Sequence, residues 1–179
     1  VEAHGSALVD FSLEVPKNAD VGEHAGCIAM QRKDDPGQRT GSIQLTNRTA
    51  VRVAVIVPGD IHRKVSIEDF AAKDAKSGPN ITFGLKNEGN VSADVKVDVD
   101  LKDIFGNKVY HNGGQYVVVA DTTFGVNYET EFRPFFGGWY KTKAFISYDK
   151  RAGTFGVNEN GQLLHDESPE ITLFVMPSI

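Results

Sequence analysis

The stretch from Ile81 to Gly106 constrains the fold most, because it holds two alternating apolar patterns separated by a short polar break. Ile81, Phe83 and Leu85 alternate with polar or small residues before the break at Asn87–Asn90. The second run alternates in the same way through Ala93, Val95, Val97, Val99 and Leu101. A strict period of two buries one face of a strand and exposes the other, as in antiparallel sheets. The stretch predicts the frame of an immunoglobulin-like sandwich, with Leu101 on its core face.

Two turns punctuate this stretch. Asn87–Asn90 reads Asn-Glu-Gly-Asn, and Gly89 can adopt a positive φ without steric cost, so we predict a turn there. Ile104–Asn107 makes a second predicted turn before the strand that starts at Lys108.

Similar alternation predicts strands along the rest of the chain. The predicted strands cover residues 7–15, 23–32, 42–57, 62–68, 80–87, 91–104, 107–111, 114–121, 123–132, 139–149 and 170–176. We expect a bulge or a bend near Asn47–Thr49 in the long third segment, and a small hairpin around Asn158–Gly161. Ile67–Lys76 could alternatively form a short helix ended by Ser77-Gly78-Pro79.

Pro58-Gly59-Asp60 is the predicted boundary between a first domain, residues 1–59, and a second domain, residues 60–179. Three or four predicted strands precede it, whereas a free-standing sandwich of this type needs about seven. We therefore expect tandem immunoglobulin-like sandwiches, all-β, of which the first is incomplete in this chain. Its remaining strands would lie upstream or come from another chain, or its small sheet would pack against the second domain.

Composition and charge exclude several functions. The formal net charge is −5 and the positive residues are scattered, which does not predict nucleic-acid binding. The longest apolar runs, Ala54–Pro58 and Tyr116–Ala120, are too short to span a bilayer. With no signal peptide and no initiator Met, we expect a processed or excised piece of a longer chain, joined to a membrane only through an anchor outside it.

The single cysteine, Cys27, excludes an intramolecular disulfide and suits a bacterial surface as well as the cytosol. His24 lies three positions before it, which raises the possibility of a cysteine nucleophile. On a strand, however, residues three apart point to opposite faces. We therefore predict a buried or semi-buried structural cysteine.

No pattern predicts catalysis, a metal or a cofactor. Asp94, Asp98 and Asp100 share one face of a predicted strand, but calcium sites need ligands that converge from loops, so we predict a solvated face. The five histidines have no zinc-ligand spacing, and nucleotide-binding or nucleophile-elbow motifs are absent. We expect a protein that is not an enzyme.

The candidate ligand or partner contacts are Phe135, Phe136, Trp139 and Tyr140, which flank Gly-Gly between two predicted strands. Planar rings on a loop can stack on sugars or anchor a protein interface. In the competing interpretation, Trp139 and one phenylalanine plug the end of the sandwich. We favour this interpretation for Trp139 and leave both open for Phe135 and Phe136.

Three N-terminal motifs resemble the second half of a cell-surface domain of bacterial WxL-interacting proteins, a domain described as peptidoglycan-binding. They are Ala3–Ala7 with the strand Phe11–Val15, then Val15–Asp20, then Gly22–Ile28. A valine-rich strand ending in Pro-Gly, here Val51–Gly59, follows in that family as well. The resemblance implies an extracellular, Gram-positive cell-surface protein.

The second half is similar to the next module of related actinobacterial surface proteins, on motifs at Asn87–Asn90, Ile104–Gly106 and Gly137–Tyr140. Together the resemblances imply a non-enzymatic module for adhesion or cell-wall attachment, with wall glycan or another surface protein as the partner. A structural spacer and an accessory domain of a secreted carbohydrate-active enzyme are the alternatives. Exposed aromatic rings would favour a binding module over a spacer.

Overall fold

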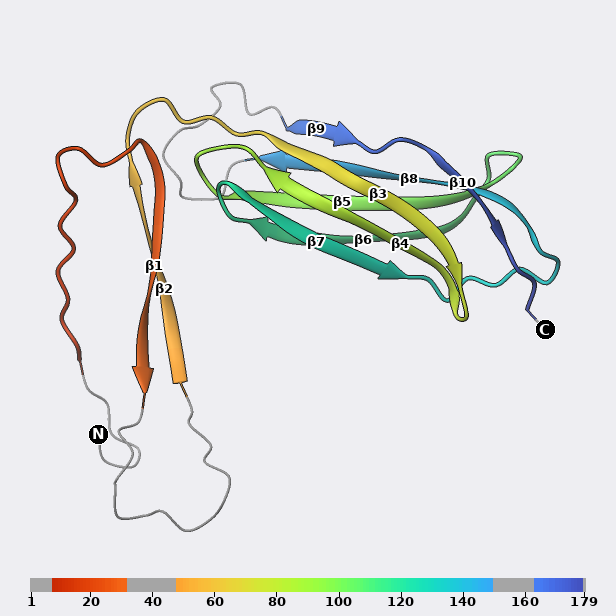
Figure 1. Cartoon of the computed structure of the whole chain (residues 1–179), viewed down its shortest axis with the longest axis horizontal. Coiled ribbons are helices and arrows are strands. Elements are labelled where there is room, and N and C mark those ends of the chain that lie inside the picture. Colours follow the sequence, from red (N-terminus) through yellow and green to blue (C-terminus); the bar gives the residue numbers. More distant parts are fainter. Residues whose placement is uncertain (1–7, 32–47, 150–162, 179) are drawn as a thin grey trace, which may run out of the picture.

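The computed structural model describes residues 8–31, 48–149 and 163–178, and in these ranges all regular structure is strand. Two parts lie at an angle to each other (Figure 1). We call the described residues before Asp60 the arm, and those from Asp60 onward the sandwich. Within the described residues, no helix is long and apolar enough to cross a membrane.

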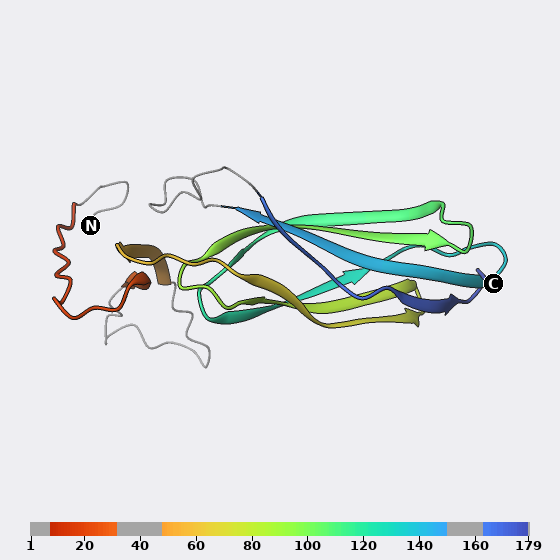
Figure 2. The same cartoon turned by 90° about the horizontal axis from the view of Figure 1, so that it is seen from above.

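The sandwich consists of two antiparallel sheets that face each other (Figure 2). The three-stranded sheet has the order β3-β4-β7, formed by β3 (Val65–Ala75), β4 (Gly78–Asn87) and β7 (Thr122–Glu129). The other sheet has the order β10-β8-β5-β6, and β9 also pairs with β8. Its strands are β5 (Ala93–Asp103), β6 (Lys108–Val118), β8 (Gly138–Asp149), β9 (Leu164–Glu167) and β10 (Ile171–Val175). The predicted all-β class and β-sandwich are confirmed.

The core lies between the two sheets and follows the predicted alternation. The inward residues of β5, including Val97, Val99 and Leu101, are fully buried, so the predicted register of this strand is correct. Ile81, Phe83 and Leu85 of the facing β4 are buried in the same way. Phe70 and Tyr128 pack tilted against Phe83 at ring distances of 5.8 and 6.2 Å.

The Asn87–Asn90 turn joins strands of opposite sheets, since β4 belongs to the three-stranded sheet and β5 to the other. Asn87 is almost fully buried at this crossing. Its Nδ2 donates to the carbonyl oxygens of Val91 and Val118, at 2.9 and 3.0 Å. Its Oδ1 accepts from the Gly89 amide at 2.9 Å. At this crossing the buried side-chain amide of Asn87 therefore satisfies backbone groups that would pair with each other in a β-hairpin.

Gly89 was expected to adopt a positive φ, and this expectation is wrong. Gly89 is not among the residues with positive φ. A Cβ at this position would instead lie 2.6 Å from the carbonyl oxygen of His62, so glycine is needed for a close approach between chain segments. The second predicted turn does use positive φ, at Gly106 (87°).

Several strand boundaries differ from the predictions. The helical alternative for 67–76 is wrong, because this segment is part of β3, with a register shift between Glu68 and Ala71. The two short strands predicted over 107–111 and 114–121 form the single strand β6, which continues through Gly113 and Gly114. β9 was not predicted. The hairpin predicted at 158–161 and the bulge or bend predicted at 47–49 fall wholly or partly outside the described residues.

The arm consists of β1 (Gly22–Gln31) and β2 (Arg48–Val57), an antiparallel pair, and the segment 8–21 that precedes them. The strand predicted at 7–15 is wrong for the described residues 8–15, which carry no strand assignment. Alternation had indicated an extended chain, but a strand also needs a neighbour to share its hydrogen bonds. β2 ends at Val57, in agreement with the predicted break at Pro58-Gly59-Asp60.

The arm and the sandwich are joined at Asn90. Its backbone oxygen accepts from the Glu23 amide at 2.8 Å, and its side chain bonds the backbones of Asp60 and His62 at 2.9 and 3.0 Å. Glu23 reaches the sandwich in turn, since its Oε2 accepts from the Ser92 amide at 2.7 Å. A Cβ on Gly22 would lie 2.4 Å from the Asn90 oxygen, so the contact also requires glycine here.

Candidate functional site

The β7–β8 loop and the C-terminus lie at the end of the sandwich opposite the arm (Figures 1 and 2). Several of the exposed aromatic side chains belong to this end. This end, which we call the tip, contains the β7–β8 loop with the start of β8 (130–139), the β5–β6 turn and the C-terminal residues 174–178. Its exposed large apolar residues are Ile104, Phe105, Phe135, Phe136, Trp139, Phe174 and Met176.

Arg133 and Asp74 hold the aromatic loop in place. Arg133 Nη1 lies 3.0 Å from both carboxylate oxygens of Asp74, which belongs to β3. The same guanidinium donates to the backbone oxygens of Ala75 and Met176, and Asp74 accepts from the Met176 amide at 3.1 Å. Both charged side chains are about four-fifths buried. A buried, multiply bonded ion pair therefore ties the loop to the β3–β4 turn and to the C-terminal segment.

Phe135 and Phe136 form the outermost pair of the tip. Their ring centroids are 4.7 Å apart with an interplanar angle of 90°, an edge-to-face contact. The two residues are 78% and 79% exposed, so they pack on each other but on little else. Neither ring plugs the end of the sandwich.

Trp139 also faces solvent, at 58% exposed, so the prediction that it plugs the sandwich is wrong. Trp139 and Tyr140 are neighbours on β8 and must point to opposite faces. Tyr140 takes the inward position and packs edge-to-face on Phe132 at 5.2 Å, partly buried against a small core cluster. Of the four predicted contact residues, three are exposed and Tyr140 is partly buried.

Phe174 is a tip residue that the analysis of the sequence missed. It is the partner of Trp139 in the β8–β10 pairing, and the two rings lie 5.4 Å apart at 73°. The signal was present in the sequence, because Phe174 stands between the apolar Leu173 and Val175 in the strand predicted at 170–176. The intervening residue of a strand must then point outward.

The acidic row of β5 lies on the outer, solvated face of its sheet, as predicted. Asp100 accepts from His111 Nδ1 and pairs with Lys108, both at 2.8 Å, and Asp98 pairs with Lys96 at 3.2 Å. Burial opposes ionisation of Asp100, but the hydrogen bonds from Lys108 and His111 outweigh it and lower its pKa. Over the ranges the structure describes, His, Cys, Asp and Glu form no group of three or more that could hold a metal ion.

Cys27 and His24 do not meet. His24 lies on the opposite face of β1, where its Nε2 is 2.8 Å from the backbone oxygen of Asp20. Cys27 is free and exposed, so the expectation of a buried cysteine is wrong. The reason is that nothing in the described chain covers its face of the two-stranded sheet.

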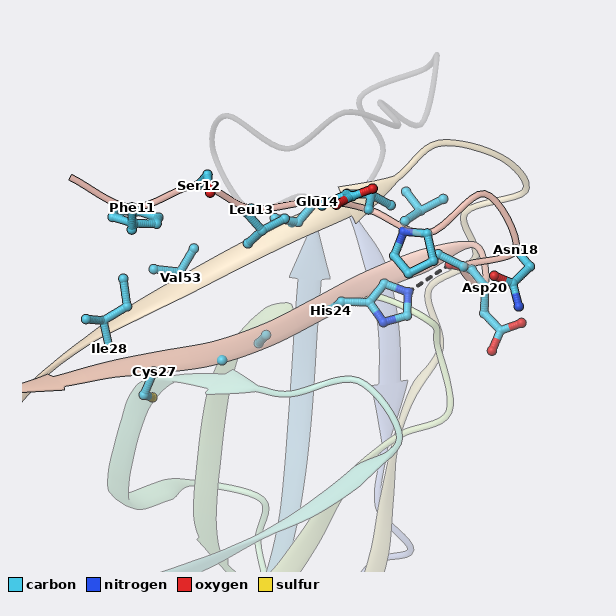
Figure 3. A pocket seen from close by; sticks show the side chains of 17 residues that line it. Phe11, Ser12, Leu13, Glu14, Asn18, Asp20, His24, Cys27, Ile28 and Val53 are labelled. Carbon is cyan, nitrogen blue, oxygen red and sulfur yellow. Dashed lines mark hydrogen bonds between the residues drawn. The ribbon is translucent and has the colours of Figure 1, made fainter.

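The arm contains an open groove of about 710 Å³ (Figure 3). One wall is the extended segment with Phe11 and Leu13, and the floor is the face of β1 and β2 that carries His24, Ile28 and Val53. The lining is apolar, as expected of a sheet face prepared for a second layer.

A scan against models of known protein families found no match to this chain. A search of curated proteins found no significantly similar sequence either.

Proposed function

We propose that this chain is a non-enzymatic, extracellular module of a Gram-positive bacterial surface protein, which contacts cell-wall glycan or another surface protein through its tip. The observation that carries the proposal is the exposure of Phe135, Phe136 and Trp139 at the end away from the arm. Large contiguous exposed apolar surface is uncommon on monomeric proteins and marks interaction sites. A spacer would have no need of such rings.

The rigidity of the loop supports the same proposal. The ion pair of Arg133 with Asp74 fixes the loop on the sandwich, so the loop backbone has less conformational freedom to lose when a partner binds. Aromatic anchors of this kind carry much of the binding energy in protein interfaces.

The strand order supports the immunoglobulin-like arrangement, which we retain as part of the proposal. β3-β4-β7 face β10-β8-β5-β6, and consecutive strands change sheets at Asn87–Asn90. The arm would be part of a second such sandwich, as the resemblance to WxL-interacting surface proteins implies. Its open apolar groove supports this view.

Co-sedimentation with purified Gram-positive cell walls tests the proposal. We expect the chain to pellet with walls, and the double variant Phe136→Ala, Trp139→Ala to stay largely in solution. Phe11→Ala is the matched control, because it removes an exposed ring from the arm and leaves the tip intact. Circular dichroism must show that all variants are folded.

The outcomes separate the candidate functions. Undiminished pelleting of the double variant would place the wall contact elsewhere. The unmodified chain could instead fail to pellet but bind a protein extracted from the cell surface through the same rings. The partner would then be a surface protein and not wall glycan. If the chain binds neither cell walls nor a surface protein, the result would favour the structural spacer.

A further inference from the structure

A second concave surface lies on the outer face of the β10-β8-β5-β6 sheet, away from the core. This groove, about 340 Å³ in volume, is lined from β5, β6 and β8 and from the segment around β9 and β10. The volume falls within the range of small-molecule sites in proteins. Phe135 and Phe136 do not line it, so it is separate from the outermost part of the tip.

An aromatic platform borders the groove. Phe145 on β8 and His165 on β9 stack with ring centroids 5.3 Å apart and an interplanar angle of 28°. Both residues are exposed. The imidazole packs against the Phe145 ring, and Phe145 itself lines the groove.

Polar groups stand beside this platform on the same face. In the sheet register Phe145 is opposite Asp98, and Asp98 is opposite Gly113 of β6. Since glycine has no side chain, Gly113 leaves space above β6 at this position. The Asp98 carboxylate lies next to that space and lines the groove. Asp100 and His111 form the next row along the strands and are hydrogen-bonded to each other at 2.8 Å.

The charges of the groove balance. Its lining includes Lys102, Lys108, Lys141 and Lys143, matched by two aspartates and two glutamates. Lys141 pairs with Glu170 and Lys143 with Glu167, both at 2.8 Å. Such a surface offers many donors and acceptors but no net field of either sign, which favours an uncharged polar ligand over a polyanion or a polycation.

A second aromatic pair continues the same face. Trp139 and Phe174 point outward from β8 and β10, and Trp139 is six positions before Phe145 on β8. At roughly 3.3 Å per residue, the two platforms are about 20 Å apart along the strand. Lys141 and Lys143 lie between them on the same face.

We propose that this outer face binds an extended, uncharged polysaccharide chain along β8. The apolar face of one sugar ring stacks on Phe145, and hydroxyl groups donate to the Asp98 and Asp100 carboxylates. A second ring, farther along the chain, stacks on Trp139. The aromatic rings provide apolar contact area for the sugar at low entropic cost, and the carboxylates fix the orientation of the sugar, as in other sites for polar ligands. The proposal shares Trp139 with the proposed wall contact and deepens its glycan alternative, but its groove is a different site.

Titration calorimetry of the full chain with chitohexaose and with cellohexaose, both uncharged, tests this proposal. We expect binding of at least one hexasaccharide, weakened about tenfold by Phe145→Ala, which removes one stacking contact. Phe11→Ala removes an exposed ring from the arm, outside both the outer groove and the tip, so it is the matched control and should bind like the unmodified chain. Asp98→Asn keeps the shape but weakens the acceptor, and should also reduce affinity while the chain stays folded.

The proposal is overturned if the unmodified chain binds neither hexasaccharide, if Phe145→Ala and Asp98→Asn bind as well as the unmodified chain, or if heparin, a polyanion, binds more tightly than both. Wall pelleting separates this proposal from the proposed function. If Phe145→Ala pellets with walls but no longer binds the hexasaccharides, the groove is a glycan site distinct from the wall contact. If the unmodified chain binds hexasaccharides but does not pellet, only the wall function fails.

Discussion

The arm and the sandwich are built from the same alternating pattern, yet they differ in what the pattern achieves. In β5 of the sandwich every inward residue is buried, and Leu101 is 0% exposed. In β2 of the arm, Val51 belongs to an equally regular valine alternation and is 55% exposed. A period of two therefore specifies which residues share a face, but a second layer is needed before that face becomes a core.

The difference follows from the cooperative nature of sheets. A two-stranded hairpin alone is marginal in water, whereas sheets that cover each other bury apolar area worth about 25 cal/mol per Å². The sandwich has two such sheets, and the arm has one face covered in part by the segment 8–15. We expect the two parts to respond differently to mutation and to acid.

The largest difference is expected for a charge placed on each apolar face. Leu101→Asp buries an unpaired carboxylate, so it should destabilise the sandwich by more than about 4 kcal/mol and unfold it. Val51→Asp, the matched change in the arm, should alter stability by less than about 0.5 kcal/mol, as surface substitutions do. Thermal melting followed by circular dichroism measures both. An unchanged melting temperature for Leu101→Asp would contradict the register of β5.

An intermediate effect is expected where the two parts meet. Glu23→Ala removes the acceptor of the Ser92 amide, which is fully buried, so stability should fall by about 1–3 kcal/mol. Hydrogen exchange should quicken at Ser92 and along β1, while the amides of the β5 core keep their protection. Glu14→Ala, on the open segment of the arm, is the control and should change neither. Exchange that is unaltered in the Glu23 variant would mean that this carboxylate does not join the arm to the sandwich.

The smallest effect is expected from acid at the β5–β6 turn. Hydrogen bonding from the Asn107 side chain, with backbone donors at Phe105 and Asn107, lowers the Asp103 pKa despite partial desolvation. A carboxyl group with a lowered pKa stabilises the fold above its unfolded pKa, and this contribution disappears as the pH falls through the folded value.

Asp103→Asn should therefore lower the melting temperature slightly near pH 7, and the difference from the unmodified chain should vanish in strong acid. Melting curves between neutral pH and pH 2 measure this. A difference that persists unchanged to the lowest pH would mean that the charge of Asp103 does not stabilise the turn.

Much of the sandwich follows from local pattern. The inward residues of β4 and β5, the turn with Gly106 and the end of β2 at Val57 were predicted correctly, because each depends on neighbours in sequence. The aromatic loop was located in the same way, since Phe135 and Phe136 precede a Gly-Gly pair between two predicted strands, but the exposure of the two rings was left open. The alternation within β10 was also sufficient to predict that Phe174 points outward.

Other features depend on segments that are distant in sequence, and only the tertiary structure decided them. Gly89 is required because His62 passes close to it, and Trp139 is exposed because Tyr140 fills the inward position against Phe132. The outer groove brings Asp98 and Phe145 together from strands far apart in the chain. The sequence by itself determined which residues face the same way, because alternation is a property of one strand. What covers each face, and which side chains meet there, depended on packing between sheets.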